Sequence, residues 1–80
     1  MKTKLLFSTE TQDYEVWQDL PLLPRIDEFF NVRDMLKPNE ISVIKQSSKC
    51  WSGTRGIIQS VEYRYNNKEF YAEIIIWCED

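Results

Sequence analysis

The sequence predicts a mostly β (α+β) fold: a small antiparallel sheet or a partly open barrel, with a C-terminal β-hairpin and one short helix near residues 39–47. Two β-rich runs flank Asn66-Asn67 between residues 56 and 78, and two earlier short segments have strand character. Aromatic residues make up 14% of the 80 residues, which indicates a core filled by large rings. A chain of this length forms at most one domain, so residues 1–80 are predicted to be a single domain.

Three short strands are predicted in the first part of the chain. Lys4–Ser8 is the first, and Tyr14–Gln18 alternates apolar and polar residues as a half-buried strand does. These two strands are close enough in sequence to form an opening hairpin, and Glu28–Val32 is the third strand. Between the second and third strands, Pro21 and Pro24 lack N–H donors and exclude a helix interior or a central strand.

The segment Ile41–Ser47 fits either a helix or a strand. As a helix, it would begin near residues 38–39, where Asn39 is a suitable cap and Glu40 suits the helix dipole. As a strand, Ile44 would break the alternation of apolar and polar residues. We therefore favour a short helix.

The C-terminal hairpin is the clearest local feature. We place its turn at Asn66-Asn67, because asparagine tolerates the left-handed conformation of tight turns, and pair Tyr65 with Lys68. This register sets Arg64 opposite Glu69 and creates one largely apolar face. The pairs on that face are Tyr63 with Phe70, Val61 with Ala72, Gln59 with Ile74, and Ile57 with Ile76.

The other face of this hairpin also becomes apolar toward its open end. The residues concerned are Ile58, Ile75 and Trp77. An end of a hairpin that is apolar on both faces has to be shielded from water on both faces. The sheet is therefore predicted to curl around this end or to be capped by the helix.

The composition argues against catalysis and against nucleic-acid binding. The chain contains no histidine, the commonest general base, and its two glycines cannot form a glycine-rich phosphate loop. Two cysteines without histidine cannot complete a zinc site in one chain unless carboxylates contribute. The net charge of −3 disfavours non-specific binding to phosphates. We therefore expect a protein that is not an enzyme and that uses no metal or cofactor.

The sequence also indicates a cytoplasmic protein without a membrane segment. No apolar run approaches the ~20 residues of a membrane span. The apolar stretch Leu5–Phe7 is shorter than the roughly 7–15 residues of a signal peptide. In the cytoplasm, Cys50 and Cys78 are expected to be free thiols.

The best candidate for a binding surface is the segment 48–56, which combines basic residues, a large ring, hydroxyls and glycines. Its candidate binding residues are Lys49, Trp51 and Arg55, because tryptophan and arginine dominate interface energetics and can stack on a nucleotide. In the alternative interpretation, Trp51 folds back to close the end of the barrel and the glycines only turn the chain.

The proline-containing segment Leu20–Glu28 is a second candidate, with Arg25 as the anchor for a partner. In the alternative interpretation, this segment is a crossover buried against the sheet.

The run Leu20-Pro21-Leu22-Leu23-Pro24-Arg25-Ile26-Asp27-Glu28, together with the closing Ile76–Asp80, resembles short uncharacterised bacterial proteins. These are often phage-like or mobile-element proteins, and some are SH3-type barrels. The resemblance implies a partly open SH3-like barrel but no functional residue, because no activity is assigned to such proteins. Asp27 stands where the resemblance leads us to expect a glycine in a tight turn.

These observations predict a small non-enzymatic protein-interaction module that binds an unidentified protein or a second copy of itself. An open sheet edge is able to pair with a second copy or with a peptide strand. The alternative is a nucleic-acid-binding small β-barrel that uses Lys49, Trp51, Arg55 and aromatic residues on one sheet face.

Overall fold

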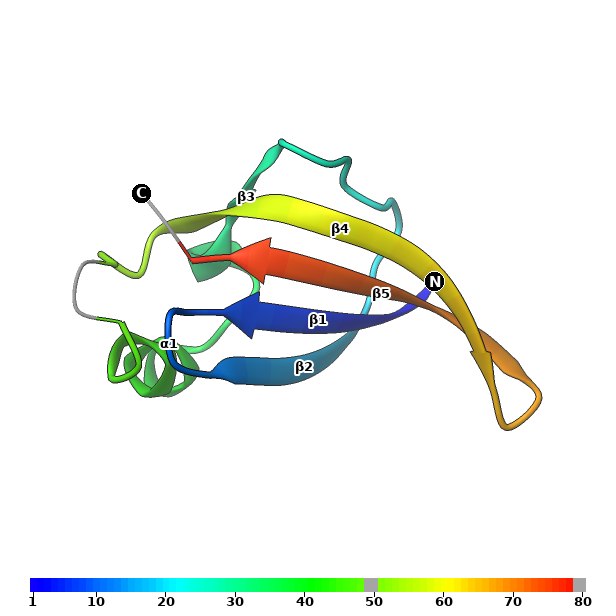
Figure 1. Cartoon of the computed structure of the whole chain (residues 1–80), viewed down its shortest axis with the longest axis horizontal. Helices are drawn as coiled ribbons and strands as arrows, with labels where there is room; N and C mark the ends of the chain where they lie inside the picture. Colours follow the sequence, from blue (N-terminus) through cyan, green and yellow to red (C-terminus); the bar gives the residue numbers. More distant parts are fainter. Residues whose placement is uncertain (49–50, 79–80) are drawn as a thin grey trace.

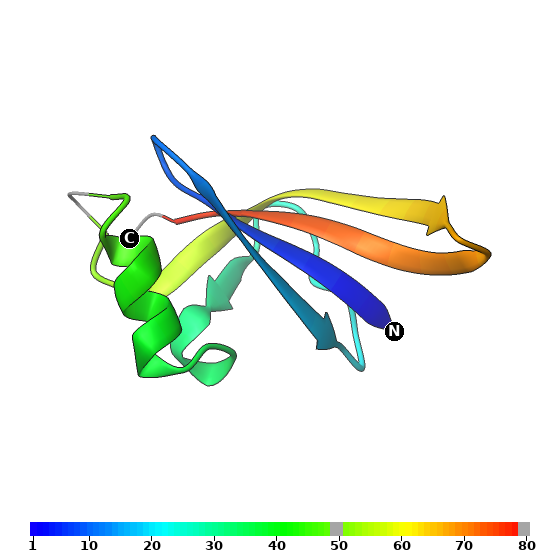
Figure 2. The same ribbon diagram turned by 90° about the horizontal axis from the view of Figure 1, so that it is seen from below.

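The computed structural model, which describes residues 1–48 and 51–78, has one five-stranded sheet of order β2-β1-β5-β4-β3 (Figure 1). The sheet curls strongly into a half-barrel, and a short helix packs at one end of it (Figure 2). The strands are β1 (Lys2–Ser8), β2 (Asp13–Asp19), β3 (Phe29–Asn31), β4 (Arg55–Asn66) and β5 (Glu69–Trp77); the helices are the 3-10 helix η1 (Val32–Asp34) and α1 (Pro38–Lys45). The predicted mostly β fold with a C-terminal hairpin and one short α-helix is confirmed.

The sheet combines two antiparallel hairpins with a parallel pair at its centre. The opening hairpin is confirmed, because β1 and β2 pair from Lys2 with Asp19 to Ser8 with Asp13. The strands β1 and β5 run parallel, which sequence analysis did not predict. Pairing between the two ends of the chain leaves no local pattern in the sequence, whereas a hairpin does.

The turn of the C-terminal hairpin lies at Asn67-Lys68 and not at Asn66-Asn67 as predicted. Both turn residues have positive φ, 51° and 65°, as a two-residue type I′ turn requires. Tyr65 therefore opposes Phe70, with ring centroids 4.6 Å apart, instead of Lys68. A shift of two residues does not by itself move a side chain to the other face of the hairpin, so the apolar pattern could not distinguish these two registers.

A bulge between Ile58 and Ser60 exchanges the faces of two neighbouring isoleucines. Ile58, not Ile57, opposes Ile76, and both side chains are fully buried. Ile57 instead opposes Trp77 on the other face of the hairpin. The extra residue of a bulge reverses the alternation of a strand, and two adjacent isoleucines do not reveal where this happens.

The helix α1 confirms the helical interpretation of residues near 39–47 and begins at Pro38, within the predicted start, but its N-cap differs from the prediction. Lys37 is the N-cap and Pro38 the first helical residue, a position that proline favours. The predicted cap Asn39 lies inside the first turn. Glu40 Oε1 accepts a hydrogen bond of 3.0 Å from the Lys37 backbone N–H, so Glu40 stabilises the first turn.

The core lies on the concave side of the half-barrel. It joins inward residues of β1, β2, β4 and β5 to residues of η1, α1 and their flanking loops. The buried apolar residues of this core are Leu5, Phe7, Val16, Leu20, Val32, Leu36, Ile44, Trp51, Ile58, Ile74, Ile76 and Cys78.

Residues 20–28, here called the crossing segment, connect β2 to the opposite edge of the sheet. Its start is held to the N-terminus, because Met1 and Leu20 exchange hydrogen bonds of 2.7 and 2.9 Å. Near its end, the Asp27 N–H donates to the Ile58 carbonyl at 2.8 Å. Leu20 is buried, but Leu22 is 83% exposed, so the predicted buried crossover holds for only part of the segment.

Asp27 adopts a left-handed conformation, with φ of 73°, in a turn closed by a 3.1 Å hydrogen bond from Glu28 N–H to the Arg25 carbonyl. We expect Asp27→Val to lower the free energy of unfolding by about 1–2 kcal/mol, because a β-branched side chain is strained at positive φ. Asp27→Gly should be neutral or stabilising by less than about 1 kcal/mol, since its relief of strain is offset by a more flexible unfolded chain. Urea denaturation of the three proteins checks this, and equal stability would show that the turn carries no strain.

Candidate functional site

The end of the β4–β5 hairpin, residues 62–71, projects beyond the rest of the sheet and is here called the arm (Figure 1). The pairing of β1 with β5 starts at Thr3 with Ala72, and β3 pairs with β4 only over residues 55–57. Within the described chain, the two strands of the arm therefore pair only with each other. The molecule is elongated as a result, with extents of 38 × 23 × 22 Å.

The core-facing side of the arm carries three exposed rings. Tyr63, Tyr65 and Phe70 are 67%, 60% and 71% exposed. They lie on the same side as the fully buried Ala72 and Ile74, because Tyr63 opposes Ala72 in the hairpin. The apolar side of the hairpin thus continues past the point where the core ends, which leaves an aromatic surface on two paired strands.

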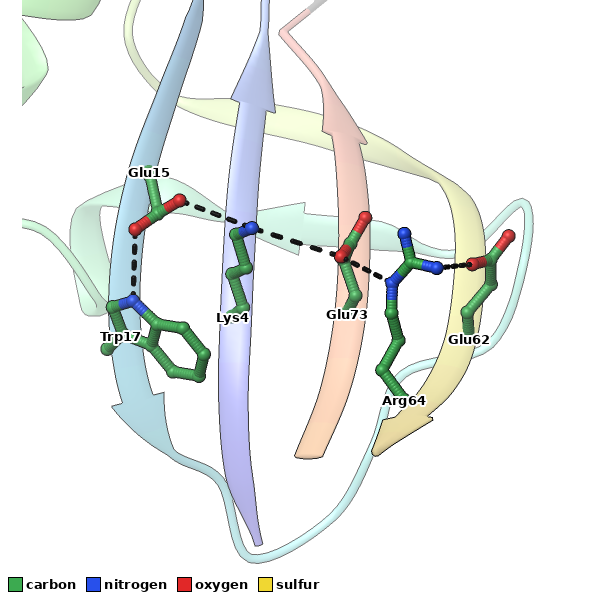
Figure 3. A network of polar contacts seen from close by, with 6 residues as sticks. All are labelled: Lys4, Glu15, Trp17, Glu62, Arg64 and Glu73. Carbon is green, nitrogen blue, oxygen red and sulfur yellow. Dashed lines mark hydrogen bonds and ion pairs between the residues drawn. The ribbon is translucent and has the colours of Figure 1, made fainter. Parts of the chain in front are cut away.

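The outer side of the sheet at the base of the arm holds a row of charges across four strands (Figure 3). Glu73 lies at the centre, 3.0 Å from Arg64 Nε and 4.0 Å from Lys4 Nζ. Lys4 Nζ is also 3.3 Å from Glu15, and Arg64 is 3.7 Å from Glu62. The hydrogen bond and the charge of Glu73 raise the pKa of Arg64 above its ordinary value.

Trp17 lies at one end of this row of charges, next to a second ion pair formed by Lys2 and Glu69. Its Nε1–H donates to Glu15 at 3.0 Å, and its ring lies 5.2 Å from that of Tyr71. Lys2 Nζ lies 5.3 Å from the Trp17 ring and 2.7 Å from Glu69, and this contact lowers the pKa of Glu69. The cations of this outer side therefore each have a carboxylate beside them.

Trp51, a predicted binding residue, is buried with 4% of its surface exposed. Its Nε1–H donates to the Arg55 carbonyl at 2.7 Å. The ring closes the core next to α1, so it offers no surface to a partner. This corrects the prediction and agrees with the alternative, in which Trp51 folds back. The physical reason is that the half-barrel leaves its end open, and a large apolar ring gains more by covering it than by facing water.

Arg55 and Arg25, two further predicted binding residues, are exposed near β3. The Arg55 guanidinium lies 4.3 Å from the centre of the Phe29 ring, which is itself 58% exposed. The Arg25 backbone N–H donates to Glu28 at 2.5 Å in the turn before β3. The structure does not bring either arginine together with the Trp51 ring in one surface, and Lys49 lies outside the described residues.

Sequence reasoning assigned Tyr63, Val61 and Phe70 to one largely apolar face of the hairpin. The face was correct, but the core ends before the arm does. The available signal was length: β4 has 12 residues, whereas β1 has 7, so a hairpin built on β4 extends past its neighbours. Alternation alone does not indicate which part of a face is covered.

Cys78 is a buried free thiol, and burial raises its pKa to about 12, which keeps it protonated and unreactive at neutral pH. The described residues contain no group of three or more His, Cys, Asp or Glu that could hold a metal ion. None of the helices in this part of the chain has the length and apolarity needed to cross a bilayer.

Comparisons of the chain with protein-family models, curated proteins and solved structures found no match. The arm and the charged outer side are the structural features that can support a proposal about function.

Proposed function

We propose that this protein is a small non-enzymatic protein-interaction module and that the aromatic side of the arm is its contact surface. The observation that carries the proposal is the exposure of Tyr63, Tyr65 and Phe70 on a hairpin that projects outside the core. Full burial of one such ring stabilises a protein by roughly 1.5–3 kcal/mol. Because these three rings are mostly exposed, they contribute little of this stabilisation to the fold. Clustered exposed apolar residues on a soluble domain mark interaction sites.

The form of this surface suits a protein partner. Aromatic residues on paired strands lose little conformational entropy on binding, and tyrosine is frequent among residues that dominate interface energies. The turn residues Asn67 and Lys68 add polar groups at the tip of the arm, beyond the rings.

The charges on the outer side favour this proposal over the nucleic-acid alternative. Lys4 and Arg64 lie beside Glu15 and Glu73, so their charge is already compensated. Carboxylates outnumber cations along this row, and a phosphate backbone would face net negative charge.

The test compares capture of partners by the tagged wild-type protein and by the double variant Tyr65→Ala/Phe70→Ala, using a lysate of the producing organism and mass spectrometry. We expect the variant to retain a tenth or less of a specific partner, because each central ring contributes about 1–2 kcal/mol to such an interface. The denaturation midpoint should change little, since both rings are exposed.

The matched control is Leu22→Ala/Ile26→Ala, which removes two exposed apolar side chains from the crossing segment and should leave capture unchanged. Equal capture by the wild type and the arm variant would refute the arm as the contact surface. Loss of the partner after nuclease treatment of the lysate would instead support nucleic-acid binding.

A further inference from the structure

The strand β4 has a long open edge on the side away from β5. It pairs with β3 over residues 55–57, and the crossing segment bonds to the backbone of Ile58. From residue 59 to residue 66, no described segment pairs with this edge. Proline and inward-pointing charges often protect exposed edges, and this stretch has neither; its two charges, on Glu62 and Arg64, lie on the outer side, and its bulge lies at its start.

The two-residue turn determines which backbone groups point to the open edge. In such a hairpin the residues that flank the turn, Asn66 and Glu69, form a hydrogen-bonded pair, and bonded pairs then alternate along the strands. The N–H and C=O groups of Glu62 and Arg64 are therefore directed to β5. Those of Val61, Tyr63 and Tyr65 are directed to the open edge.

We propose that the open edge of β4 pairs antiparallel with the same edge of a second copy of this chain, around a two-fold axis at Tyr63. Tyr63 then faces Tyr63 of the second copy, and Val61 faces Tyr65. All residues with free backbone groups meet their counterparts, and each facing pair exchanges both N–H···O bonds. The inference deepens the proposed function, on which it rests, by naming a partner for the arm.

The charges of the arm select this register. On its outer side, Glu62 faces Arg64 of the second copy, and Arg64 faces Glu62. A shift of two residues in one direction would set Glu62 against Glu62, and in the other direction Arg64 against Arg64. Opposite charges across strands stabilise pairing, whereas like charges destabilise it. Of these three registers, only the one centred on Tyr63 sets opposite charges against each other.

The same register brings the turn of each copy to the crossing segment of the other. Lys68, in the turn, then comes close to the place where Asp27 and Glu28 of the second copy bond to the backbone of Ile58. Two exposed carboxylates thus meet an exposed ammonium group at each end of the pairing. The aromatic sides of the two arms become one continuous surface. The apolar area offered to a further partner is then twice that of a single arm.

The mass of the full chain is measured by sedimentation from about 10 μM to about 1 mM, where an interface of this modest size is expected to associate. Glu62→Arg sets two arginines against each other in each half of the interface and should weaken association about tenfold or more. We expect this variant to fold as the wild type does, because the new arginine lies directly opposite Glu73 on β5. Glu62→Arg/Arg64→Glu restores opposite charges across the axis and should recover association.

Asp34→Arg is the matched control: it makes the same change in net charge on η1, away from the arm, and should leave association unchanged. Amide exchange gives the position of the interface. The amides of Val61, Tyr63 and Tyr65 should become protected as concentration rises, whereas those of Glu62 and Arg64 are protected throughout.

A monomer at every concentration would overturn the self-pairing, and association that is insensitive to Glu62→Arg would overturn this register. Neither result affects the capture experiment with Tyr65→Ala/Phe70→Ala, whose failure would count against the arm as a binding surface for other proteins.

Discussion

Gly56→Ala is expected to lower the free energy of unfolding by about 3 kcal/mol, because β4 approaches β5 too closely at this point for a side chain. A Cβ atom at residue 56 would lie 2.5 Å from Ile76 Cγ2 and 2.8 Å from the Trp77 carbonyl oxygen. Ile76 is fully buried, and Trp77 belongs to a strand paired on both sides, so neither is free to move. For 80 residues, a total stability of about 4–12 kcal/mol is usual, and this loss is a large part of it.

Urea denaturation followed by tryptophan fluorescence measures this effect, and a double-mutant cycle shows its cause. In an Ile76→Ala background the Cγ2 contact is absent, so Gly56→Ala should cost less there than in the wild type. An alanine variant as stable as the wild type would mean that the two strands separate locally at no cost, contrary to the close approach described above.

Trp51→Ala should lower the free energy of unfolding by about 3–5 kcal/mol, as removal of a large buried ring from a core does. The substitution leaves a cavity where the ring closes the core, and it removes the hydrogen bond to the Arg55 carbonyl. Trp51→Phe keeps most of the packing and loses this hydrogen bond, so we expect a smaller loss of about 1–2 kcal/mol.

Arg55→Ala is the informative control for Trp51, because it removes the guanidinium but keeps the carbonyl that accepts the indole N–H. It should change stability by less than about 0.5 kcal/mol, as exposed substitutions usually do. If Trp51→Ala proved as stable as the wild type yet lost a binding partner, Trp51 would be part of a contact surface after all.

These two predictions and the capture experiment separate the segment that the sequence indicated as a site from the arm that the structure indicates. The segment 51–56 contributes to the core through Trp51 and to strand packing through Gly56. The arm contributes little to the core, and its exposed rings are available to a partner. Substitutions in the first region should therefore reduce stability, whereas substitutions of Tyr65 and Phe70 should reduce binding.

Local patterns determined the elements of this protein. The alternation in Tyr14–Gln18 and along the C-terminal hairpin predicted strands, and the residues before Ile41 favoured a helix, because these signals come from neighbours in the chain. The left-handed turn was also placed within one residue, since Asn66 and Asn67 both tolerate it.

Tertiary structure decided how those elements combine. The register of the hairpin differs by two residues from the predicted one, and the bulge exchanges Ile57 with Ile58, because both registers and both isoleucines satisfy the same apolar pattern. The parallel pairing of β1 with β5 joins the two ends of the chain. The burial of Trp51 and the exposure of Tyr63 depend on where the core ends, and that is set by the lengths of strands packed side by side and not by any single segment.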